Sequence, residues 1–276
     1  MKLTQAVLPV AGLGTRFLPW TKVVPKELLP LGNEPIIAHL VAECLSVGIT
    51  DICFVISKGK EAIPQYFAPH PELEEELRKR GKLEALSQLQ KYDSVRFHVV
   101  YQDEQKGDGH AILQANDWIS AETVAVLFGD DLILHEKNGL QQLLSAYADV
   151  AEKHPEETPA LLSLENVPTH LVSKYGIVEI DDGGSIGNIK RIRGLVEKPH
   201  PSKAPSTLGI IGKYLIPRST FKALPSIEGG HGGEIRLIDA LTSQLNEVPI
   251  YGVEMQGKRL DTGTPEGYKE AVRMLG

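Results

Sequence analysis

Short apolar runs alternate with longer amphipathic stretches along the first half of the chain. The apolar runs predict buried strands at 6–10, 51–57, 95–101 and 124–128. Helical periodicity predicts helices at 35–47, 72–90, 110–118 and 140–153. This alternation is typical of an α/β fold, in which a mostly parallel sheet carries helices on both faces.

The second half has a less regular pattern in which apolar runs dominate. They predict strands at 160–164, 175–180, 186–196, 208–216 and 248–255. Helices are expected at 218–224, at 234–245 and from about Thr264 to the end, and Asp181-Asp182-Gly183-Gly184 predicts a hairpin turn. We expect one domain over 1–276, with a first half at about 1–153 and a second at about 160–276.

Composition narrows the class of protein. A hydrophobic fraction of 42% and a charged fraction of 24% over 276 residues are ordinary for a soluble globular chain. The net charge of −7 argues against nucleic acid as a partner, since a basic face is its usual footprint. No apolar stretch is long enough for a membrane span or a signal-peptide core, so we expect a cytoplasmic protein without a membrane partner. Cys44 and Cys53 are expected to be buried, reduced thiols.

A glycine-rich turn follows the first predicted strand, at Ala11-Gly12-Leu13-Gly14-Thr15-Arg16. Successive backbone N–H groups in such a turn can bind an anion, and Arg16 adds positive charge. Lys26, between two prolines, is placed to meet a phosphate. An ordinary tight turn is equally open, because Phe17 breaks the G-x-G-x-x-G pattern and no P-loop sequence follows.

Aspartates follow the predicted strand at 124–128 and precede the last helix. Asp130 and Asp131 come at the carboxyl end of a strand, where parallel sheets bind ligands, so they could face the glycine-rich turn. Beside a triphosphate, a carboxylate would need a cation such as Mg²⁺. A turn or helix-capping role is the alternative for Asp130, Asp131 and Asp261, and residue chemistry alone favours it.

The stretch AGLGTRFLPWTKVVPKELLPL resembles the opening of the sugar nucleotidyltransferases, G-x-G-T-R-x-x-P-x-T-x-x-x-P-K, and most of all that of the bacterial UTP–glucose-1-phosphate uridylyltransferases. The segments LFGDDLI, VEKP and the D-x-G at Asp261 resemble further motifs of that family, and the resemblance covers about 3–272. Trp20 departs from it, because the family usually has a small residue there. The resemblance implies a Rossmann-like fold of the nucleotide-diphospho-sugar transferase type, with an added β region on the sugar side.

The resemblance also implies a set of site residues and Mg²⁺ as the cofactor. Backbone and side chains that hold the nucleotide would be Ala11, Gly12, Gly14, Thr15, Gln102 and Gly107. Charges that act on the phosphates would be Arg16, Lys26 and Lys198. Contacts with the sugar would come from Gly176, Glu197, Gly212 and the loop from His231 to Ile235. The metal ligands would be Asp130 and Asp261.

The implied reaction joins UTP and glucose 1-phosphate to give UDP-glucose and pyrophosphate, in a homodimer or homotetramer. The sugar phosphate would attack the α-phosphorus in line. Two alternatives stay open: another sugar-1-phosphate nucleotidyltransferase that uses dTTP or a different hexose, and a catalytically silent regulator that binds sugar nucleotides. Retention of Lys26, Asp130 and Lys198 argues against the silent regulator.

The segment 101–111, YQDEQKGDGHA, resembles the uracil-reading loop R-Q-x-x-x-K-G-x-G-H-A of the uridylyltransferases. The amide of Gln102 can both donate and accept, which suits O4 and N3–H of uracil. Asp108 stands where the family usually has leucine. We expect Asp108 to point outward and cap the following helix at His110; the alternative is that it alters the pocket around the base or the sugar.

Overall fold

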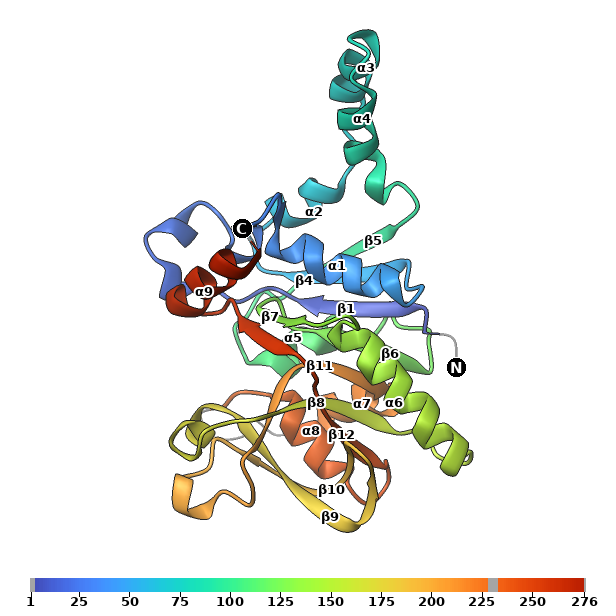
Figure 1. The fold of residues 1–276 in the computed structure, drawn as a ribbon, viewed down its shortest axis with the longest axis vertical. Helices are drawn as coiled ribbons and strands as arrows, with labels where there is room; N and C mark the ends of the chain where they lie inside the picture. The colour runs from blue at the N-terminus through green and yellow to red at the C-terminus, as the bar shows by residue number, and fades with distance from the viewer. Residues whose placement is uncertain (1–2, 228–232, 276) are drawn as a thin grey trace.

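A computed structural model of the chain describes residues 3–227 and 233–275, and a nine-stranded sheet runs through it (Figure 1). The strand order is β5-β4-β1-β6-β11-β8-β12-β10-β9. The bounds of these strands are β1 Gln5–Pro9, β4 Asp51–Ile56, β5 Arg96–Tyr101, β6 Thr123–Leu127, β8 Ala160–Asn166, β9 Gly176–Ile186, β10 Ile189–Glu197, β11 Leu208–Pro217 and β12 Ile250–Glu254.

The direction of the strands divides this sheet into two regions. Strands β5, β4, β1 and β6 are mutually parallel, as the repeated strand and helix of the first half predict. Strand β11 then pairs antiparallel with both β6 and β8, so strands of both halves share one sheet. Strands β9 and β10 form an antiparallel pair at the far edge, the added β region. The predicted α/β fold class is confirmed, but the sheet is mixed and not mostly parallel, because β9, β10 and β11 pair antiparallel with their neighbours.

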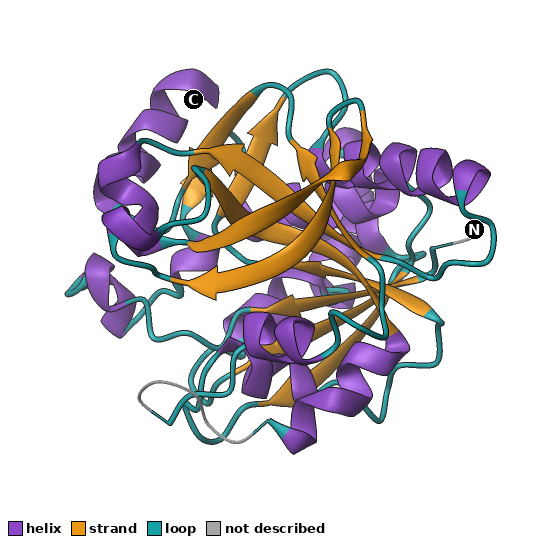
Figure 2. Cartoon of the chain, turned by 90° about the horizontal axis from the view of Figure 1, so that it is seen from below, coloured by secondary structure: helices purple, strands orange, loops and turns teal. Residues whose placement is uncertain are grey.

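Helices cover both faces of the sheet (Figure 2). Successive side chains of a strand point to opposite faces, so Ala6 and Leu8 pack in one core and Val7 packs in the other. The first core takes apolar residues of α1 and α6, and the second takes those of α5 and α8. The helices, apart from two described below, are α1 Ile36–Ser46, α2 Ala62–Phe67, α5 Asp108–Leu113, α6 Gly139–Lys153, α7 Arg218–Ala223, α8 Leu237–Ser243 and α9 Pro265–Leu275.

The prediction of one continuous helix over 72–90 is wrong. Two helices, α3 Pro71–Lys79 and α4 Leu83–Leu89, replace it and project from the body of the molecule (Figure 1). The break falls at Gly81, whose φ of 65° is left-handed, a conformation that glycine adopts without a steric penalty.

The hairpin turn predicted at 181–184 is also wrong. Strand β9 continues to Ile186, and the chain turns at Gly187-Asn188, where Gly187 has a φ of 61°. The helix predicted over 110–118 begins at Asp108 and ends at Leu113, and the one predicted over 234–245 covers only Leu237–Ser243. The last helix begins as predicted, because Thr264 Oγ1 accepts a hydrogen bond of 3.1 Å from the N–H of Gly267.

A two-stranded ribbon beside the main sheet positions the acidic residues. Strand β7, Asp131–Leu134, pairs antiparallel with β13, Lys258–Asp261, and this register places Asp131 opposite Asp261. Segments about 130 positions apart in the sequence therefore meet next to the carboxyl ends of β1 and β6. A second short ribbon joins β2, Pro30–Leu31, to β3, Glu34–Pro35.

Both cysteines are free and buried, as expected. Within residues 3–227 and 233–275, none of the helices has the length and apolar character that crossing a membrane requires.

Candidate active site

Two adjoining cavities open at the carboxyl ends of the parallel strands. The smaller, of about 210 Å³, is lined by Ala11, Gly12, Lys26, Gln102, Gly107 and others. The larger, of about 790 Å³, is lined by Arg16, Gly176, Glu197, Lys198, Gly212, Asp261 and others. Asp108, Phe128 and Asp130 line both, so one elongated ligand could occupy the two cavities at once.

The cavities separate the residues expected to bind the nucleotide from those expected to bind the sugar. Gly14 and Thr15 line neither cavity. Gly14 has a left-handed φ of 64°, and its carbonyl accepts a 2.9 Å hydrogen bond from Thr21 Oγ1. Gly14 and Thr15 therefore shape the turn that carries Arg16 into the larger cavity. Trp20 is 59% exposed and also lines neither cavity.

Lys26 and Asp130 form an ion pair at the junction of the cavities, with Nζ 2.6 Å from Oδ2. Burial disfavours the Lys26 ammonium, but Asp130 and Glu27 outweigh burial, so the pKa of Lys26 lies above its ordinary value. Burial also disfavours the Asp130 carboxylate, and Lys26 more than reverses this effect, so the pKa of Asp130 is lowered. Both groups stay charged and stabilise each other.

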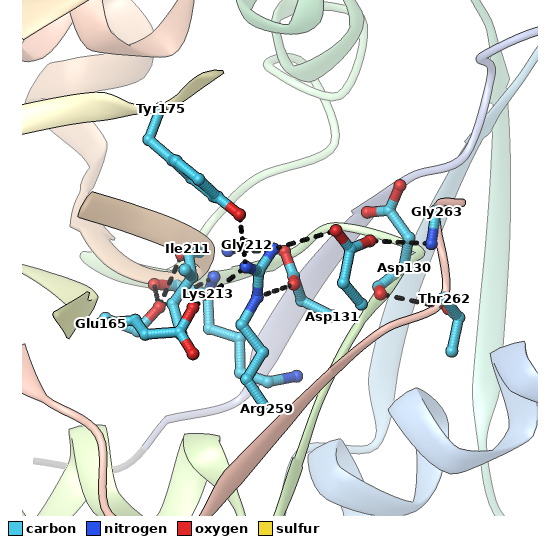
Figure 3. Close-up of polar contacts among 12 residues, drawn as sticks. Asp130, Asp131, Glu165, Tyr175, Ile211, Gly212, Lys213, Arg259, Thr262 and Gly263 are labelled. Atoms are coloured by element: carbon cyan, nitrogen blue, oxygen red, sulfur yellow. Dashed lines mark hydrogen bonds and ion pairs between the residues drawn. The ribbon is translucent and has the colours of Figure 1, made fainter. Parts of the chain in front are cut away.

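Asp130 and Asp261 converge on Gly263, and Figure 3 shows Asp130 beside Gly263. A Cβ at Gly263 would lie 2.6 Å from Oδ2 of Asp130 and 3.0 Å from Oδ1 of Asp261, so only glycine fits there. The N–H of Gly263 donates to Asp261 Oδ1 at 2.9 Å, and the N–H of Thr262 donates to the Asp130 carbonyl at 2.8 Å. Two carboxylates beside a phosphate site are a donor set that suits Mg²⁺.

Arg259 is a site residue that sequence reasoning missed. Its Nε pairs with Asp131, and its Nη1 lies 3.1 Å from both Glu165 Oε2 and the Tyr175 hydroxyl (Figure 3). Burial opposes the charge on Arg259, but Asp131 outweighs burial, so its pKa is raised. Arg259 thereby ties the ribbon that bears Asp261 to the strands of the larger cavity. The one feature of the sequence that could have indicated a role for Arg259 in the site was its position two residues before Asp261.

Asp131 also holds Gly212. Its Oδ2 accepts a 3.0 Å hydrogen bond from the Gly212 N–H, and a Cβ at Gly212 would lie 2.5 Å from that oxygen. Gly212 lines the larger cavity, but its N–H points to Asp131. A contact between Gly212 and a sugar therefore stays a prediction, and it would have to use another atom.

Glu197, Lys198 and Gly176 lie together in the larger cavity. Gly176 pairs with Glu197 across β9 and β10, and the Glu197 carboxylate lies 2.8 Å from Lys198 Nζ and 3.7 Å from Arg236 Nη1. Lys198 has a φ of 46°, the one positive φ of a non-glycine residue within 3–227 and 233–275. Such a conformation costs about 1–3 kcal/mol and is typical of functional sites. The N–H of Lys198 donates to the Tyr175 carbonyl at 3.0 Å, which holds it in place.

A buried ion pair beneath the smaller cavity was likewise missed. Lys60 Nζ lies 2.9 Å from Glu27 Oε2 and 2.7 Å from the Val10 carbonyl. Burial lowers the pKa of Lys60, and Glu27 opposes this effect. Because Glu27 follows Lys26 and Val10 precedes Ala11, this pair fixes the lysine and the glycine-rich turn relative to one another.

The loop at 102–110 packs against the segment that leads into α8. Gln102 Nε2 donates to the Gly107 carbonyl at 3.0 Å, so the amide closes the loop. A Cβ at Gly107 would collide with the Ile235 carbonyl oxygen, and one at Gly109 would lie 2.7 Å from the Arg236 carbonyl carbon. Both glycines thus admit a neighbouring backbone, a reason that the sequence did not reveal.

Asp108 is exposed, as expected, but the expectation that it caps a helix at His110 is wrong. The helix α5 begins at Asp108 itself, and Asp108 Oδ1 accepts a 2.9 Å hydrogen bond from the N–H of Leu237, the first residue of α8. The side chain lines both cavities. In the sugar-side loop expected from His231 to Ile235, residues 231 and 232 lie outside the described residues.

The sheet topology, the glycine-rich turn and the paired cavities define the class of nucleotidyltransferase-type α/β proteins. A family model described as nucleotidyl transferase matches residues 5–275, and the chain belongs to that family.

Relatives of known name support the finer resemblance. The UTP–glucose-1-phosphate uridylyltransferase YngB of Bacillus subtilis (strain 168) is 40% identical over 276 residues, 100% of this chain and 90% of its own. A putative enzyme of the same name from Methanocaldococcus jannaschii is 38% identical over 278 residues, covering 99% of this chain and 93% of its own.

Solved structures agree with these relatives. A UDP-glucose pyrophosphorylase complexed with UDP-glucose is similar with a TM-score of 0.84 and 32% identity, over 99% of this chain and 98% of its own. The UTP-bound UGPase from Acinetobacter baumannii is similar with a TM-score of 0.87 and 33% identity, over 99% of this chain and 93% of its own. The resemblance drawn from the sequence motifs is confirmed.

Proposed function

We propose that the chain transfers the uridylyl group of UTP to glucose 1-phosphate and releases pyrophosphate and UDP-glucose. One observation carries the proposal: two cavities meet at Asp130, with Lys26 on the side of the glycine-rich turn and Lys198 on the other. That arrangement suits a nucleotide in the smaller cavity and a sugar phosphate in the larger. The names of the relatives above support the substrates.

In this reaction, a phosphate oxygen of glucose 1-phosphate attacks the α-phosphorus of UTP. The new P–O bond forms as the bond to the β-phosphate oxygen breaks, and pyrophosphate leaves with that electron pair. The reaction requires positioning and charge stabilisation and needs no covalent nucleophile. Lys26 and Arg16 would stabilise the nucleotide phosphates, and Lys198 would hold the attacking phosphate. Glu197 would accept hydrogen bonds from sugar hydroxyls.

We also propose that Mg²⁺ is the cofactor and that Asp130 and Asp261 hold it. The convergence of both carboxylates on Gly263 supports this donor set. When bound, Mg²⁺ would neutralise charge on the phosphates. Manganese, which has similar ligand preferences and an electron spin signal, offers a test of binding that is independent of activity.

Finer features follow from the same family resemblance. We propose a homodimer or homotetramer that works in the cytoplasm. Light scattering after size-exclusion chromatography measures the mass of the assembly directly. The net charge of −7 supports the absence of a nucleic-acid partner.

The decisive experiment measures pyrophosphate release with each of UTP, dTTP, ATP, CTP and GTP against several hexose 1-phosphates. We expect the highest kcat/KM for UTP with glucose 1-phosphate. A preference for dTTP or for another hexose would reassign the substrate within the family. Binding without turnover under every combination would instead favour a sugar-nucleotide-binding regulator.

A further inference from the structure

Asp108 places an acceptor at the junction of the two cavities. It is one of the few residues that line both, and its side chain is exposed to the cleft. Its Oδ1 accepts the Leu237 N–H at 2.9 Å, which fixes the plane of the carboxylate. Within the described residues, no side chain donates to the carboxylate, whose donors are the backbone N–H groups of Leu237 and Gly109. An anionic acceptor therefore faces the place where a ligand would pass from one cavity into the other.

The backbone around Asp108 is held rigidly. The N–H of Ile235 donates to the Lys106 carbonyl at 2.7 Å, and the N–H of His110 donates to the Ile235 carbonyl at 3.2 Å. Gly109 is pressed against the backbone of Arg236, as described above. A carboxylate mounted in this way loses little conformational entropy when a ligand binds, so its hydrogen bond can contribute in full.

The neighbours of Asp108 lie on the sugar side. The surrounding walls of the cleft partly desolvate the carboxyl, although the residue stays open to the cleft, and this raises the pKa of Asp108; the N–H groups of Leu237 and Gly109 oppose this effect. Smaller influences come from Glu197, which raises the pKa of Asp108, and from Lys198, which lowers it. Asp108 therefore belongs to the same electrostatic environment as the residues proposed to act on the sugar phosphate.

We propose that Asp108 is a specificity-determining residue, in which Oδ2 accepts a hydrogen bond from a ring hydroxyl of the substrate that spans the two cavities. The inference rests on the proposed function, because it assumes that a nucleotide and a sugar phosphate meet there. A carboxylate accepts from hydroxyls and repels phosphates, so the ligand group is a hydroxyl. The hydroxyl belongs either to the hexose or to the ribose.

Two variants separate this role from a structural one. Asp108→Asn keeps an oxygen for the Leu237 N–H and presents an NH₂ group in place of Oδ2. Asp108→Leu removes both acceptors. Asp103→Asn is the matched control, since Asp103 is exposed in the same loop and lines neither cavity. Thermal unfolding of all three variants reports whether the bond to Leu237 matters for the fold.

Each enzyme is assayed with glucose 1-phosphate and its 2-, 3-, 4- and 6-deoxy derivatives, and with UTP and 2′- and 3′-deoxy-UTP. We expect Asp108→Asn to lower kcat/KM about 10- to 100-fold for the full substrates, the worth of a hydrogen bond to a charged group. For one deoxy compound, kcat/KM should fall as much with the wild type. It should fall no further with Asp108→Leu, which can neither accept nor donate at this position, because the same bond is already missing. A deoxy hexose with this pattern assigns the hydroxyl to the sugar, and a deoxy nucleotide assigns it to the ribose.

An active wild type whose losses with the deoxy compounds are all unchanged in Asp108→Leu would overturn the inference and leave Asp108 as a residue that only anchors Leu237. A wild type that releases no pyrophosphate from UTP and glucose 1-phosphate would overturn the proposed function instead. The two failures are therefore distinguishable. Whether the hydroxyl belongs to the hexose or to the ribose, Asp103→Asn should show the same falls in kcat/KM with the deoxy compounds as the wild type.

Discussion

Lys26 Nζ lies 2.6 Å from Asp130 Oδ2, so a lysine expected to bind phosphate and an aspartate expected to bind metal neutralise each other in the protein alone. A triphosphate would compete with Asp130 for the lysine, and a cation would compete with the lysine for Asp130. Under the proposed function, nucleotide and metal would therefore favour each other's binding through this pair. Under the proposed function, each single substitution at the pair also leaves an uncompensated charge behind.

Lys26→Ala should lower kcat about 100- to 1000-fold, because one preorganised donor to developing charge is worth that much in rate. The KM for UTP should change less. Steady-state kinetics with UTP varied at saturating glucose 1-phosphate give both parameters. Lys58→Ala, at an exposed lysine, is the control and should behave as wild type. A rise in KM with kcat intact would mean that Lys26 binds the ground and transition states equally.

Asp130→Asn should lower kcat/KM by about 100-fold or more and leave the fold intact, since it removes the charge that a cation needs at nearly constant shape. Added Mg²⁺ should restore activity only in part. The binding of Mn²⁺, followed by its electron spin signal, should weaken in step. The matched control is Asp149→Asn, at an exposed position of α6. Near-normal turnover at ordinary Mg²⁺ would remove Asp130 from the list of metal ligands.

Glu197→Ala should weaken the use of glucose 1-phosphate and leave UTP binding close to wild type. Glu197 lies in the larger cavity only, 2.8 Å from Lys198 Nζ, so its loss removes a sugar acceptor and frees the lysine. Calorimetry with UTP alone and kinetics with glucose 1-phosphate varied separate the two effects. Glu179→Ala, at a half-buried glutamate on β9 that pairs with Arg193 and lines neither cavity, serves as the control. An equal loss of UTP affinity would show that the pair acts on the nucleotide.

Stability should depend on pH through Glu157, at the far end of the sheet. Burial raises its pKa, but hydrogen bonds from Arg191 Nη1 at 2.9 Å and the Tyr251 hydroxyl at 2.8 Å outweigh burial, so the pKa of Glu157 is lowered. A lowered folded-state pKa contributes stability above the pKa of an unfolded glutamate, about 4.3, and loses it as pH falls through the folded value.

Glu157→Gln should therefore lower the free energy of unfolding by about 2 kcal/mol at pH 7. The difference from wild type should shrink as pH falls below about 4.3 and through the lowered folded-state pKa of Glu157, below which the carboxyl is protonated in both states. Urea titrations at both pH values measure it. Glu156→Gln, at the exposed residue next to it, should show no such dependence. A difference that stays constant with pH would mean that the charge of Glu157 contributes nothing.

Local patterns in the sequence were sufficient to predict the parallel half of the sheet and several residues that line the cavities. Buried strands are short apolar runs, and their carboxyl ends share one edge, so Lys26 and Asp130 could be placed in one crevice before the structure was known. The break at Gly81 and the turn at Gly187 were missed because glycine at those positions acts through a left-handed φ, which periodicity does not detect.

Contacts that depend on distant pairing could not be predicted. Arg259 meets Asp131 only because β7 pairs with β13, 128 positions apart, and neither residue carries a local motif for that pairing. The hydrogen-bond partner of Asp108 was missed for the same reason, since Leu237 is 129 positions away. A short-range helix cap was the simpler interpretation, and tertiary packing overrode it.

The choice of base should depend on Gln102, which is 3% exposed at the edge of the smaller cavity. Its Nε2 donates to the Gly107 carbonyl at 3.0 Å and lies 3.1 Å from His110 Nδ1, so the side chain holds the loop closed. Within the described residues, no side chain donates a hydrogen bond to the Gln102 carbonyl oxygen that would compete with uracil N3–H. We expect the base to be read through this oxygen.

Gln102→Ala should therefore lower kcat/KM for UTP about 10- to 100-fold and reduce the ratio of kcat/KM for UTP over dTTP. Gln102→Glu keeps an acceptor oxygen but loses the bond to Gly107, so it should retain more UTP activity than Gln102→Ala if reading the base dominates. Gln105→Ala is the control for loop mobility, because Gln105 Nε2 ties the same loop to the Ala11 carbonyl at 3.3 Å. Equal losses for UTP and dTTP in Gln102→Ala, matched by Gln105→Ala, would mean that Gln102 orders the loop without selecting the base.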